Sequence, residues 1–488
     1  MHEADTATTT TPPKEPTVAI ESNEIDRVFA AQQANRDAVA ATDARARIEK
    51  LKALLETIEK NRQAIRDALY ADFRKPPAEV DLTETYVVTS EIKHAIKHLP
   101  KWMKPRRVRP VRALLTTRAW IRYEPKGNVL IISPWNFPFN LTLGPLVSAI
   151  AAGNCAVVKP SEFTPHTSEL CKNLVERLFP KDEIAFFLGD QEVAKRLLAK
   201  PFNHVFFTGS PEVGKLVMKA AAEHLASVTL ELGGKSPVIV DETADVTDAA
   251  QKVAWGKFMN NGQTCLAPDY VYVHERVYAP FLEALKQAVE RSYGKSQEER
   301  HRSPDYARII SERHHARLRH LLEESVKQGA KVEFGGTTDE RERYLEPTVV
   351  THVPEDAPLM QEEIFGPILP VHAFASLDEA LQVIRSKPRP LALYVFSRNR
   401  AHIERVFAHT TSGGSCINDV VLQFMHLNLP FGGINQSGIG NAHGFYGFKA
   451  FSHERAYLKQ GRFSPLKWMY PPYRPRVQKL IDLTLKYF

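Results

Sequence analysis

Apolar residues near the start of the chain recur at the spacing of an α-helix. The pattern runs from residue 25 to about residue 73 and predicts helices that bury one face. It is carried by Ile48, Leu51, Leu55, Ile58, Ile65 and Leu69. Pro76 and Pro77 predict its end. Residues 1–20, dominated by Thr, Pro and charge, are typical of a disordered segment or an extended arm. The basic stretch 101–112, which contains two prolines, predicts a connecting segment instead of a helix.

From residue 129 onward, short uninterrupted apolar runs alternate with helical patterns. Such a run is typical of a parallel strand that is buried on both faces. The helical patterns include residues 141–152 and a helix that starts at Thr164-Pro165. The predicted strands are 129–132, 155–158, 184–188, 204–208 and 228–232. This alternation predicts a doubly wound parallel sheet, an architecture that binds nucleotides at the carboxyl ends of its strands.

The alternation restarts after Gly233 and predicts a second α/β domain. Helical patterns lie at 246–259, 278–292 and 314–328. Strands are predicted at 237–240, 270–273, 393–396 and 413–417. The predicted fold class is therefore α/β, with a doubly wound cofactor domain followed by a second α/β domain.

Composition narrows the class of protein. The chain has 488 residues, a net charge of +7 and no block of five like charges, which indicates a solvated surface and no nucleic-acid partner. A weak attraction to anionic ligands or membrane surfaces is the alternative. Four cysteines without a CxxC pair or zinc spacing predict no metal site and a reducing, cytoplasmic location. We see no signal peptide, and no apolar run reaches the roughly 18 residues that a transmembrane anchor needs.

A glycine-containing turn at residues 209–215 follows a predicted strand and opens a helix. Backbone N–H groups and the helix dipole at such a turn can face a phosphate. The spacing matches a P-loop except at Leu216, where Ser or Thr should bind magnesium, and this disfavours an NTPase. The turn also lacks the G-x-G-x-x-G dinucleotide fingerprint. Taken alone, a plain structural helix start explains it equally well.

Cys265 lies in a polar stretch, residues 261–268, outside any apolar periodic run. A lone cysteine is usually inert and buried, but this position suits a partly exposed thiolate with backbone amides nearby. Cys155, Cys171 and Cys416 lie in predicted strands or a helix, and we assign them to packing.

Two further polar residues stand where a site is expected. Glu231 lies between two leucines at the end of a predicted strand, where a carboxylate is costly unless it is functional or paired. A general base and a structural ion pair are both open. Asn136 follows the first buried strand in a rigid Pro-Trp-Asn-Phe-Pro turn, and its amide is either an oxyanion donor or a turn stabiliser.

These motifs together resemble the aldehyde dehydrogenase superfamily over residues 25 to about 460. Seven motifs occur in the family's order: PWNFP, VKPSE, FTGSPEVG, LELGGKSP, GQTC, EEIFGP and PFGG with SGIG. Three further segments resemble its class 3-like branch, which oxidises fatty, benzylic and phenylpropanoid aldehydes: GQTCLAPDY at 262–270, HGFYGFKAFSHERA at 443–456 and WMYPPY at 468–473.

The resemblance implies a mechanism. Cys265 corresponds to the nucleophile that attacks the aldehyde carbon, and Asn136 with the backbone N–H of Cys265 corresponds to the oxyanion hole. Glu231 corresponds to the base that activates water to hydrolyse the thioester. The product is then the carboxylic acid of a hydrophobic aldehyde, either aliphatic of medium or long chain or aromatic.

The resemblance also implies an NAD or NADP cofactor. Lys159 and Glu162 correspond to the residues at the adenosine ribose. A carboxylate suits two free ribose hydroxyls and repels a 2′-phosphate, so Glu162 favours NAD over NADP. The other cofactor-binding positions implied are Trp135, Gly209, Ser210, Gly214, Glu363 and Phe365.

The family architecture implies a homodimer and a division of the chain. The NAD(P)-binding domain takes residues 21–107 and 128–232, the catalytic domain 233–415, a bridging oligomerisation arm 108–127 and 440–460, and a C-terminal tail 461–488. After Pro475 the tail predicts an amphipathic helix, which either docks over a substrate entrance or touches a membrane surface.

Two other functions are weighed against this one. A CoA-acylating aldehyde dehydrogenase needs no water-activating base, and its branch usually lacks Glu at the position of Glu231. A non-catalytic structural or binding member of the fold is disfavoured because Cys265, Glu231 and Asn136 are all present.

Overall fold

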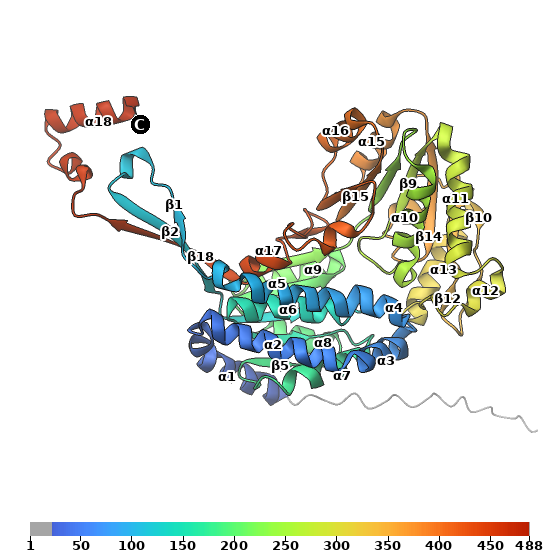
Figure 1. Cartoon of the computed structure of the whole chain (residues 1–488), viewed down its shortest axis with the longest axis horizontal. Helices are drawn as coiled ribbons and strands as arrows, with labels where there is room; N and C mark the ends of the chain where they lie inside the picture. Colours follow the sequence, from blue (N-terminus) through green and yellow to red (C-terminus); the bar gives the residue numbers. More distant parts are fainter. Residues whose placement is uncertain (1–21, 488) are drawn as a thin grey trace, which may run out of the picture.

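The computed structural model describes residues 22–487, so the segment predicted at 1–20 lies outside the described residues. Two sheets with flanking helices form the body of the molecule, and a narrow arm projects from it (Figure 1). This arrangement confirms the predicted α/β class with two parallel-sheet units.

The first sheet has six strands in the order β17-β7-β6-β3-β4-β5. Its five parallel strands were predicted from their apolar runs, and their burial is the reason for those runs. The short β17 runs antiparallel to β7 and comes from the far C-terminal part of the chain. The bounds are β3 Asn128–Ile132, β4 Cys155–Lys159, β5 Ile184–Phe186, β6 His204–Gly209, β7 Ser227–Leu232 and β17 Gly438–Ile439.

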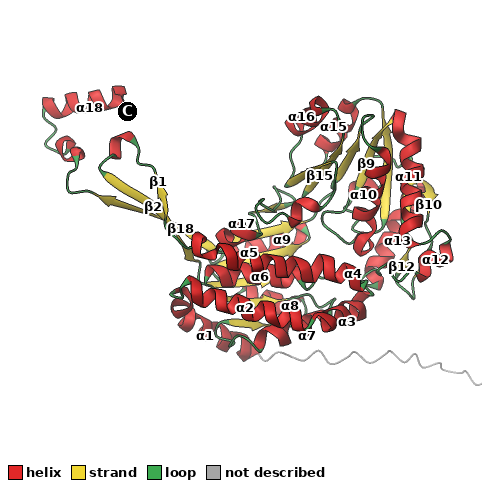
Figure 2. Ribbon diagram, viewed as in Figure 1, coloured by secondary structure: helices red, strands yellow, loops and turns green. Residues whose placement is uncertain are grey.

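Alternate residues of β3 belong to different hydrophobic clusters, because successive side chains of a strand point to opposite faces. Val129 and Ile131 join a cluster with α2, α5 and α6, while Leu130 and Ile132 join one with α1, α8 and α9. Helices therefore cover both faces, as a doubly wound sheet requires (Figure 2). These helices are α1 Ser22–Ala40, α2 Ala44–Lys60, α3 Arg62–Phe73, α4 Pro77–Val80, η1 Asp81–Thr85, α5 Tyr86–Trp102, α6 Asn140–Ala152, α7 Pro165–Glu176, α8 Gln191–Leu198 and α9 Pro211–Ala222.

The second sheet has seven strands in the order β10-β13-β14-β9-β8-β15-β16, parallel except for the edge strand β10. Its strands are β8 Pro237–Val240, β9 Tyr270–His274, β10 Lys331–Phe334, β13 Thr348–Thr351, β14 Ile368–Phe374, β15 Ala392–Phe396 and β16 Gly414–Ile417. Its larger helices are α10 Val246–Phe258, α11 Glu275–Tyr293, α13 Glu312–Lys327, α15 Leu377–Ser386 and α16 Arg400–His409. Shorter elements are η3 Met259–Gly262, α12 Gln297–Arg302, the pair β11 Thr338–Asp339 and β12 Tyr344–Leu345, α14 Pro358–Gln361 and η4 Leu422–Met425.

The arm is a three-stranded antiparallel sheet in the order β1-β2-β18. Its elements are β1 Arg106–Val108, η2 Arg112–Leu114, β2 Thr117–Pro125 and β18 Ser452–Gln460. The prediction of a mere connecting segment over 101–112 is wrong, since it holds the end of α5 and all of β1. Exposed polar strands lack the apolar pattern that marks buried ones, and β1 is exposed throughout.

The helix predicted after Pro475 is present as α18 (Pro475–Tyr487), and it lies at the far end of the arm beside η5 (Pro465–Met469) (Figure 1). None of its residues is buried, and Leu485 is 80% exposed. The short helix α17 (Gly444–Ala450) instead packs on α5 and α6 in the body. Between residues 22 and 487, no helix has the length and apolar character needed to cross a membrane.

Candidate active site

A cavity of about 790 Å³ opens at the carboxyl ends of β6 and β7, where the loops of the second sheet meet the first. Ligand sites are expected at this edge of a doubly wound sheet. Eight of the eleven sequence-predicted site residues line it: Trp135, Asn136, Gly209, Ser210, Glu231, Cys265, Glu363 and Phe365.

The turn that carries Cys265 is held by unusual backbone geometry. Asn260 and Asn261 have left-handed φ values of 55° and 56°, and Gly262 has a φ of 71°. A Cβ on Gly262 would meet the backbone oxygen of Gly366 at 2.3 Å, so only glycine fits. The buried amide of Gln263 donates to the backbone oxygens of Asn260 (3.1 Å) and Arg308 (3.0 Å), which fixes the turn that precedes Cys265.

Cys265 is half-buried and lines the cavity, as predicted. Burial raises the pKa of its thiol to about 12, and the neighbouring carboxyl groups of Glu363 and Glu231 act in the same direction. Burial therefore favours the protonated thiol in this structure, and the reactive thiolate stays a prediction. Cys155 and Cys171 are buried as predicted, whereas Cys416 is only half-buried and donates to Gln423.

Asn136 is tied to the same turn. Its Nδ2 donates to the backbone oxygen of Gln263 at 3.0 Å, and its own backbone oxygen accepts from Asn260 Nδ2 at 2.9 Å. A carboxamide nitrogen carries two hydrogens, so one remains for the cavity.

Glu231 lies at the end of β7 and is buried, with no hydrogen-bond partner for either carboxyl oxygen within the described chain. Burial raises its pKa well above the ordinary value. The structural ion pair considered above is therefore wrong, since no cation between residues 22 and 487 pairs with it. An unpartnered carboxyl group at a cavity wall is available to bind a water molecule and take its proton.

The turn after β6 leads directly into α9. Ser210 is the N-cap residue, and its Oγ accepts from the backbone N–H of Val213 at 3.4 Å. Gly214 does not line the cavity. A Cβ there would meet Leu232 at 2.9 Å, so its lack of a side chain lets α9 pack closely on β7. Thr208 Oγ1 lines the cavity without a partner among the described residues, which leaves a polar position for a ligand.

Lys159 and Glu162 lie outside the cavity lining but at the adjoining strand end. Lys159 ends β4 opposite Ile132, the last residue of β3. Its Nζ pairs with Glu162 Oε2 at 2.9 Å, with the lysine buried and the glutamate side chain 39% exposed.

The loop after α14 brings Glu363 and Phe365 against the first sheet. A Cβ on Gly233 would meet Glu363 Oε2 at 2.1 Å, so the glycine allows this close approach. Burial raises the pKa of Glu363 to about 8, against the lowering effect of a hydrogen bond from the Gly234 backbone. The rings of Phe365 and Trp135 meet edge to face at 5.4 Å.

Sequence reasoning missed two residues that line this part of the cavity. Arg317 Nη1 donates to the backbone oxygen of Glu363 at 3.3 Å, and its Nη2 donates to that of Ile364 at 2.5 Å. The ring of His314 lies 5.0 Å from that of Trp135. Both residues lie on α13, three positions apart. Charged residues at this spacing are typical of a solvent-exposed helix face, so the sequence pattern offers no reason to assign them to a site.

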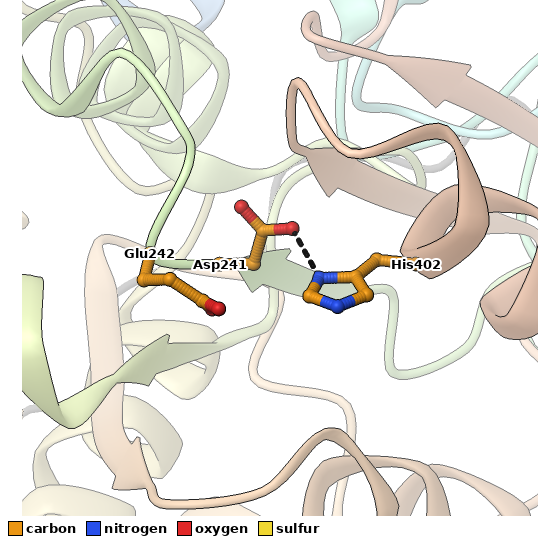
Figure 3. A group of neighbouring side chains, drawn as sticks. All are labelled: Asp241, Glu242 and His402. Atoms are coloured by element: carbon orange, nitrogen blue, oxygen red, sulfur yellow. Dashed lines mark hydrogen bonds and ion pairs between the residues drawn. The ribbon is translucent and has the colours of Figure 1, made fainter.

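A separate polar cluster consists of Asp241, Glu242 and His402, whose possible ligand atoms lie within 4.8 Å of one another (Figure 3). The Asp241 carboxylate accepts from the Thr243 backbone at 2.8 Å, from His402 Nδ1 at 3.0 Å and from Ser397 Oγ. Because these donors occupy the carboxylate, the cluster ties α16 to the end of β8 and does not indicate a cation.

Comparison with known proteins shows which family the chain resembles in sequence and in structure. Residues 10–456 match the aldehyde dehydrogenase family. The chain is 44% identical to the 4,4′-diaponeurosporen-aldehyde dehydrogenase of Staphylococcus aureus, over 88% of this chain and 92% of that protein. It is also 44% identical to bovine aldehyde dehydrogenase family 3 member B1, over 89% and 92%. The structure of substrate-bound Staphylococcus aureus AldH superposes with a TM-score of 0.90 at 42% identity, covering 94% of this chain and 99% of that one.

A further solved neighbour, PnpE, was determined with nicotinamide adenine dinucleotide; it is 26% identical with a TM-score of 0.82, and the match covers 91% of each chain. The prediction of a nicotinamide dinucleotide cofactor is thereby confirmed for the family. The extent of the family match, together with close relatives along nearly the whole chain, shows that this protein belongs to the aldehyde dehydrogenase family.

Proposed function

We propose that the enzyme oxidises a hydrophobic aldehyde, aliphatic of medium or long chain or aromatic, to its carboxylic acid through a thioester on Cys265. The observation that carries the proposal is the shared cavity of Cys265, Asn136 and the unpartnered Glu231. A largely apolar wall supports the hydrophobic substrate; it is formed by Val87, Leu141, Trp255, Met259, Phe424 and Phe431.

In the first step, Cys265 Sγ bonds to the aldehyde carbon and the carbonyl oxygen becomes an oxyanion. Because burial favours the protonated thiol, the thiol gives up its proton to solvent as Sγ attacks, and Glu231 stays free to act as base in the last step. The free Nδ2 hydrogen of Asn136 and the backbone N–H of Cys265 donate to the oxyanion. Donors held in place in this way stabilise the adduct without reorganisation.

The residues present fit a nicotinamide dinucleotide. Gly209 and Ser210 present the start of α9 to the pyrophosphate, beside the unpartnered Thr208 Oγ1. Lys159 and Glu162 hold the adenosine ribose, with Glu162 favouring NAD. Trp135, Glu363 and Phe365 hold the nicotinamide ribose and ring. When bound, this cofactor accepts the hydride that leaves the thiohemiacetal carbon, and a thioester of Cys265 remains.

In the last step, Glu231 takes a proton from a water molecule whose oxygen bonds to the thioester carbon. The C–S bond breaks, Cys265 regains its proton, and the carboxylic acid leaves. Transfer of the acyl group to CoA does not need a carboxyl group that activates water, and neither does a non-catalytic protein. The presence of Glu231 therefore favours hydrolysis of the thioester over both alternatives.

A substrate panel tests the proposal. Purified protein is mixed with NAD and aldehydes of increasing chain length, and the absorbance of the reduced cofactor is followed. We expect turnover that favours the hydrophobic aldehydes. Turnover that depends on added CoA identifies the acylating reaction, and no turnover with any aldehyde identifies a non-catalytic protein.

We further propose that two copies pair through the arm. In the described chain, β18 is one of the two outer strands of the arm sheet. Likewise, β16 is one of the two outer strands of the second sheet, with Ile417 48% exposed. Unpaired strand edges are templates for pairing with another chain.

Deleting residues 476–488 tests the role of the C-terminal tail. If the tail docks over the substrate entrance of a partner subunit, the deletion should change KM more for long aldehydes than for short ones. Equal changes with lost binding to anionic liposomes favour membrane contact.

A further inference from the structure

The cavity that holds Cys265 is also lined by a polar pair that the proposed chemistry does not use. Glu91 on α5 and His443, just before α17, both line the cavity. Their side chains face each other, with Glu91 Oε2 3.5 Å from His443 Nδ1. Glu91 is only 3% exposed, and an ionisable group so deeply buried is rare without a partner.

The two carboxyl oxygens of Glu91 have different surroundings. Oε1 accepts a hydrogen bond from the backbone N–H of Gly444 at 2.6 Å, which explains a structural role for the residue. Oε2 makes no hydrogen bond with any described residue. The His443 ring nitrogen opposite Nδ1 has no hydrogen-bond partner between residues 22 and 487 either. A structural role therefore accounts for one oxygen, and it leaves Oε2 and that ring nitrogen without a hydrogen bond among the described residues.

The position of His443 is enforced by its surroundings. Its φ is +68°, a left-handed conformation that costs free energy for a residue with a side chain. The rings of Phe424 and Phe431 pack edge to face against the imidazole at 4.6 and 5.2 Å. Val87, one helical turn before Glu91 on α5, also lines the cavity. The polar pair is thus held rigidly within an apolar wall.

We propose that Glu91 and His443 form a subsite for a hydroxyl group at the end of the aldehyde remote from the carbonyl. A hydroxyl both donates and accepts, so it can donate to Glu91 Oε2 and accept from or donate to the free imidazole nitrogen. A terminal carboxylate would be repelled by Glu91, and a terminal methyl would leave both polar atoms unpaired. Val87, Phe424 and Phe431 contact the apolar part of the same substrate. The subsite rests on the proposed aldehyde oxidation and names the substrate class within it.

The test uses matched substrates and a conservative variant. The full-length enzyme with NAD is assayed on alkanals and on ω-hydroxyalkanals of equal length, and on cinnamaldehyde and 4-hydroxycinnamaldehyde. Glu91→Gln keeps an oxygen for the Gly444 N–H and replaces the free acceptor by an amide. Val87→Ala, on the same helix, changes the cavity volume without changing a polar atom and serves as the control. Thermal unfolding checks that both variants fold.

We expect the hydroxylated member of at least one pair to have the higher kcat/KM, by about ten- to a hundredfold for a hydrogen bond to a charged group. Glu91→Gln should remove that preference, whereas Val87→Ala should keep it. Calorimetric binding of the same pairs to Cys265→Ser should show the same ratio without turnover. Oxidation of alkanals with no preference for hydroxylated partners, or a preference that survives Glu91→Gln, overturns the subsite alone. Absence of all aldehyde oxidation instead overturns the proposed function.

Discussion

Asn136 Nδ2 lies 3.0 Å from the backbone oxygen of Gln263, two residues before Cys265. The side chain that is proposed to stabilise the oxyanion is therefore fastened to the turn that carries the nucleophile. Because Asn260 Nδ2 bridges the backbone oxygens of both segments, the two move as one unit. Positioning of this kind is what makes an oxyanion donor effective.

Replacing Asn136 by alanine removes this donor. We expect kcat to fall by about a hundred- to a thousandfold, the usual effect of losing one donor to an oxyanion. Single-turnover kinetics should locate the loss before thioester formation. A variant that keeps wild-type turnover contradicts the assignment of Asn136.

Cys265 and Glu231 should separate the two halves of the reaction. Cys265→Ala should abolish dehydrogenase turnover, while Glu231→Gln should form the thioester and hydrolyse it slowly. Rapid acid quenching and intact mass spectrometry of Glu231→Gln should reveal the acyl adduct. Turnover of Glu231→Gln at the wild-type rate would remove Glu231 from the role of base.

The selectivity for NAD should depend on Glu162. In the proposed ribose site its carboxylate would repel a 2′-phosphate, so Glu162→Gln should narrow the gap in kcat/KM between NADP and NAD. Glu169→Gln, which removes an exposed charge from α7, is the matched control. An unchanged ratio in Glu162→Gln places the residue outside the ribose site.

Alkylation of Cys265 should follow the raised pKa of its thiol. With a pKa of about 12, the thiolate fraction of the cofactor-free enzyme rises about tenfold per pH unit throughout neutral and mildly alkaline pH. Iodoacetamide labelling, quantified on the peptide that contains Cys265, should therefore keep accelerating from pH 7 to 9. Glu363→Gln should raise the rate, because that carboxyl group raises the thiol pKa. A plateau below pH 8 is the contradicting result.

Light scattering at micromolar concentration should report about twice the 55.1 kDa mass of one chain. Ile417→Asp, which places a charge on the exposed edge strand β16, should shift the protein toward the monomer. Leu225→Asp alters a 95% exposed leucine on the body and should leave the mass unchanged. A wild-type monomer over the whole range contradicts pairing through the arm.

Sequence alone identified most of the buried strands, but it missed the buried strands β13 and β14 of the second sheet. The runs at β3, β4 and β6 are apolar because both faces of the sheet are covered, so their pattern is visible without a structure. Strand β1 is exposed, and its polar residues carry no such signal. The polar edge strand β10 was missed for the same reason.

The candidate site divides in the same way. Cys265, Asn136 and Glu231 could be identified from their local sequence. Cys265 lies in a polar stretch outside any apolar run, Asn136 lies in a rigid turn after a buried strand, and Glu231 lies between two leucines at the end of a strand. The burial that raises the thiol pKa, and the absence of a hydrogen-bond partner for the Glu231 carboxyl group among residues 22–487, arise only from tertiary packing. The pair Glu91 and His443 is separated by most of the chain, so no local pattern could bring the two together.

Strand β17 connects regions that a domain diagram would separate. Gly438 pairs with Glu231 in the first sheet, and Leu232 N–H donates to the backbone oxygen of Ser437 at 3.0 Å. The chain thus leaves the first sheet after β7 and forms the whole second sheet. It then returns as β17, which pairs with β7. A protein cut after Gly233 would give an amino-terminal fragment whose last strand lacks its outer neighbour, with Glu231 on an open edge. Activity from two such fragments would then require that they reassociate. In a chimera made from two related proteins, residues 437–439 and β7 would have to come from the same parent, because they pair with each other.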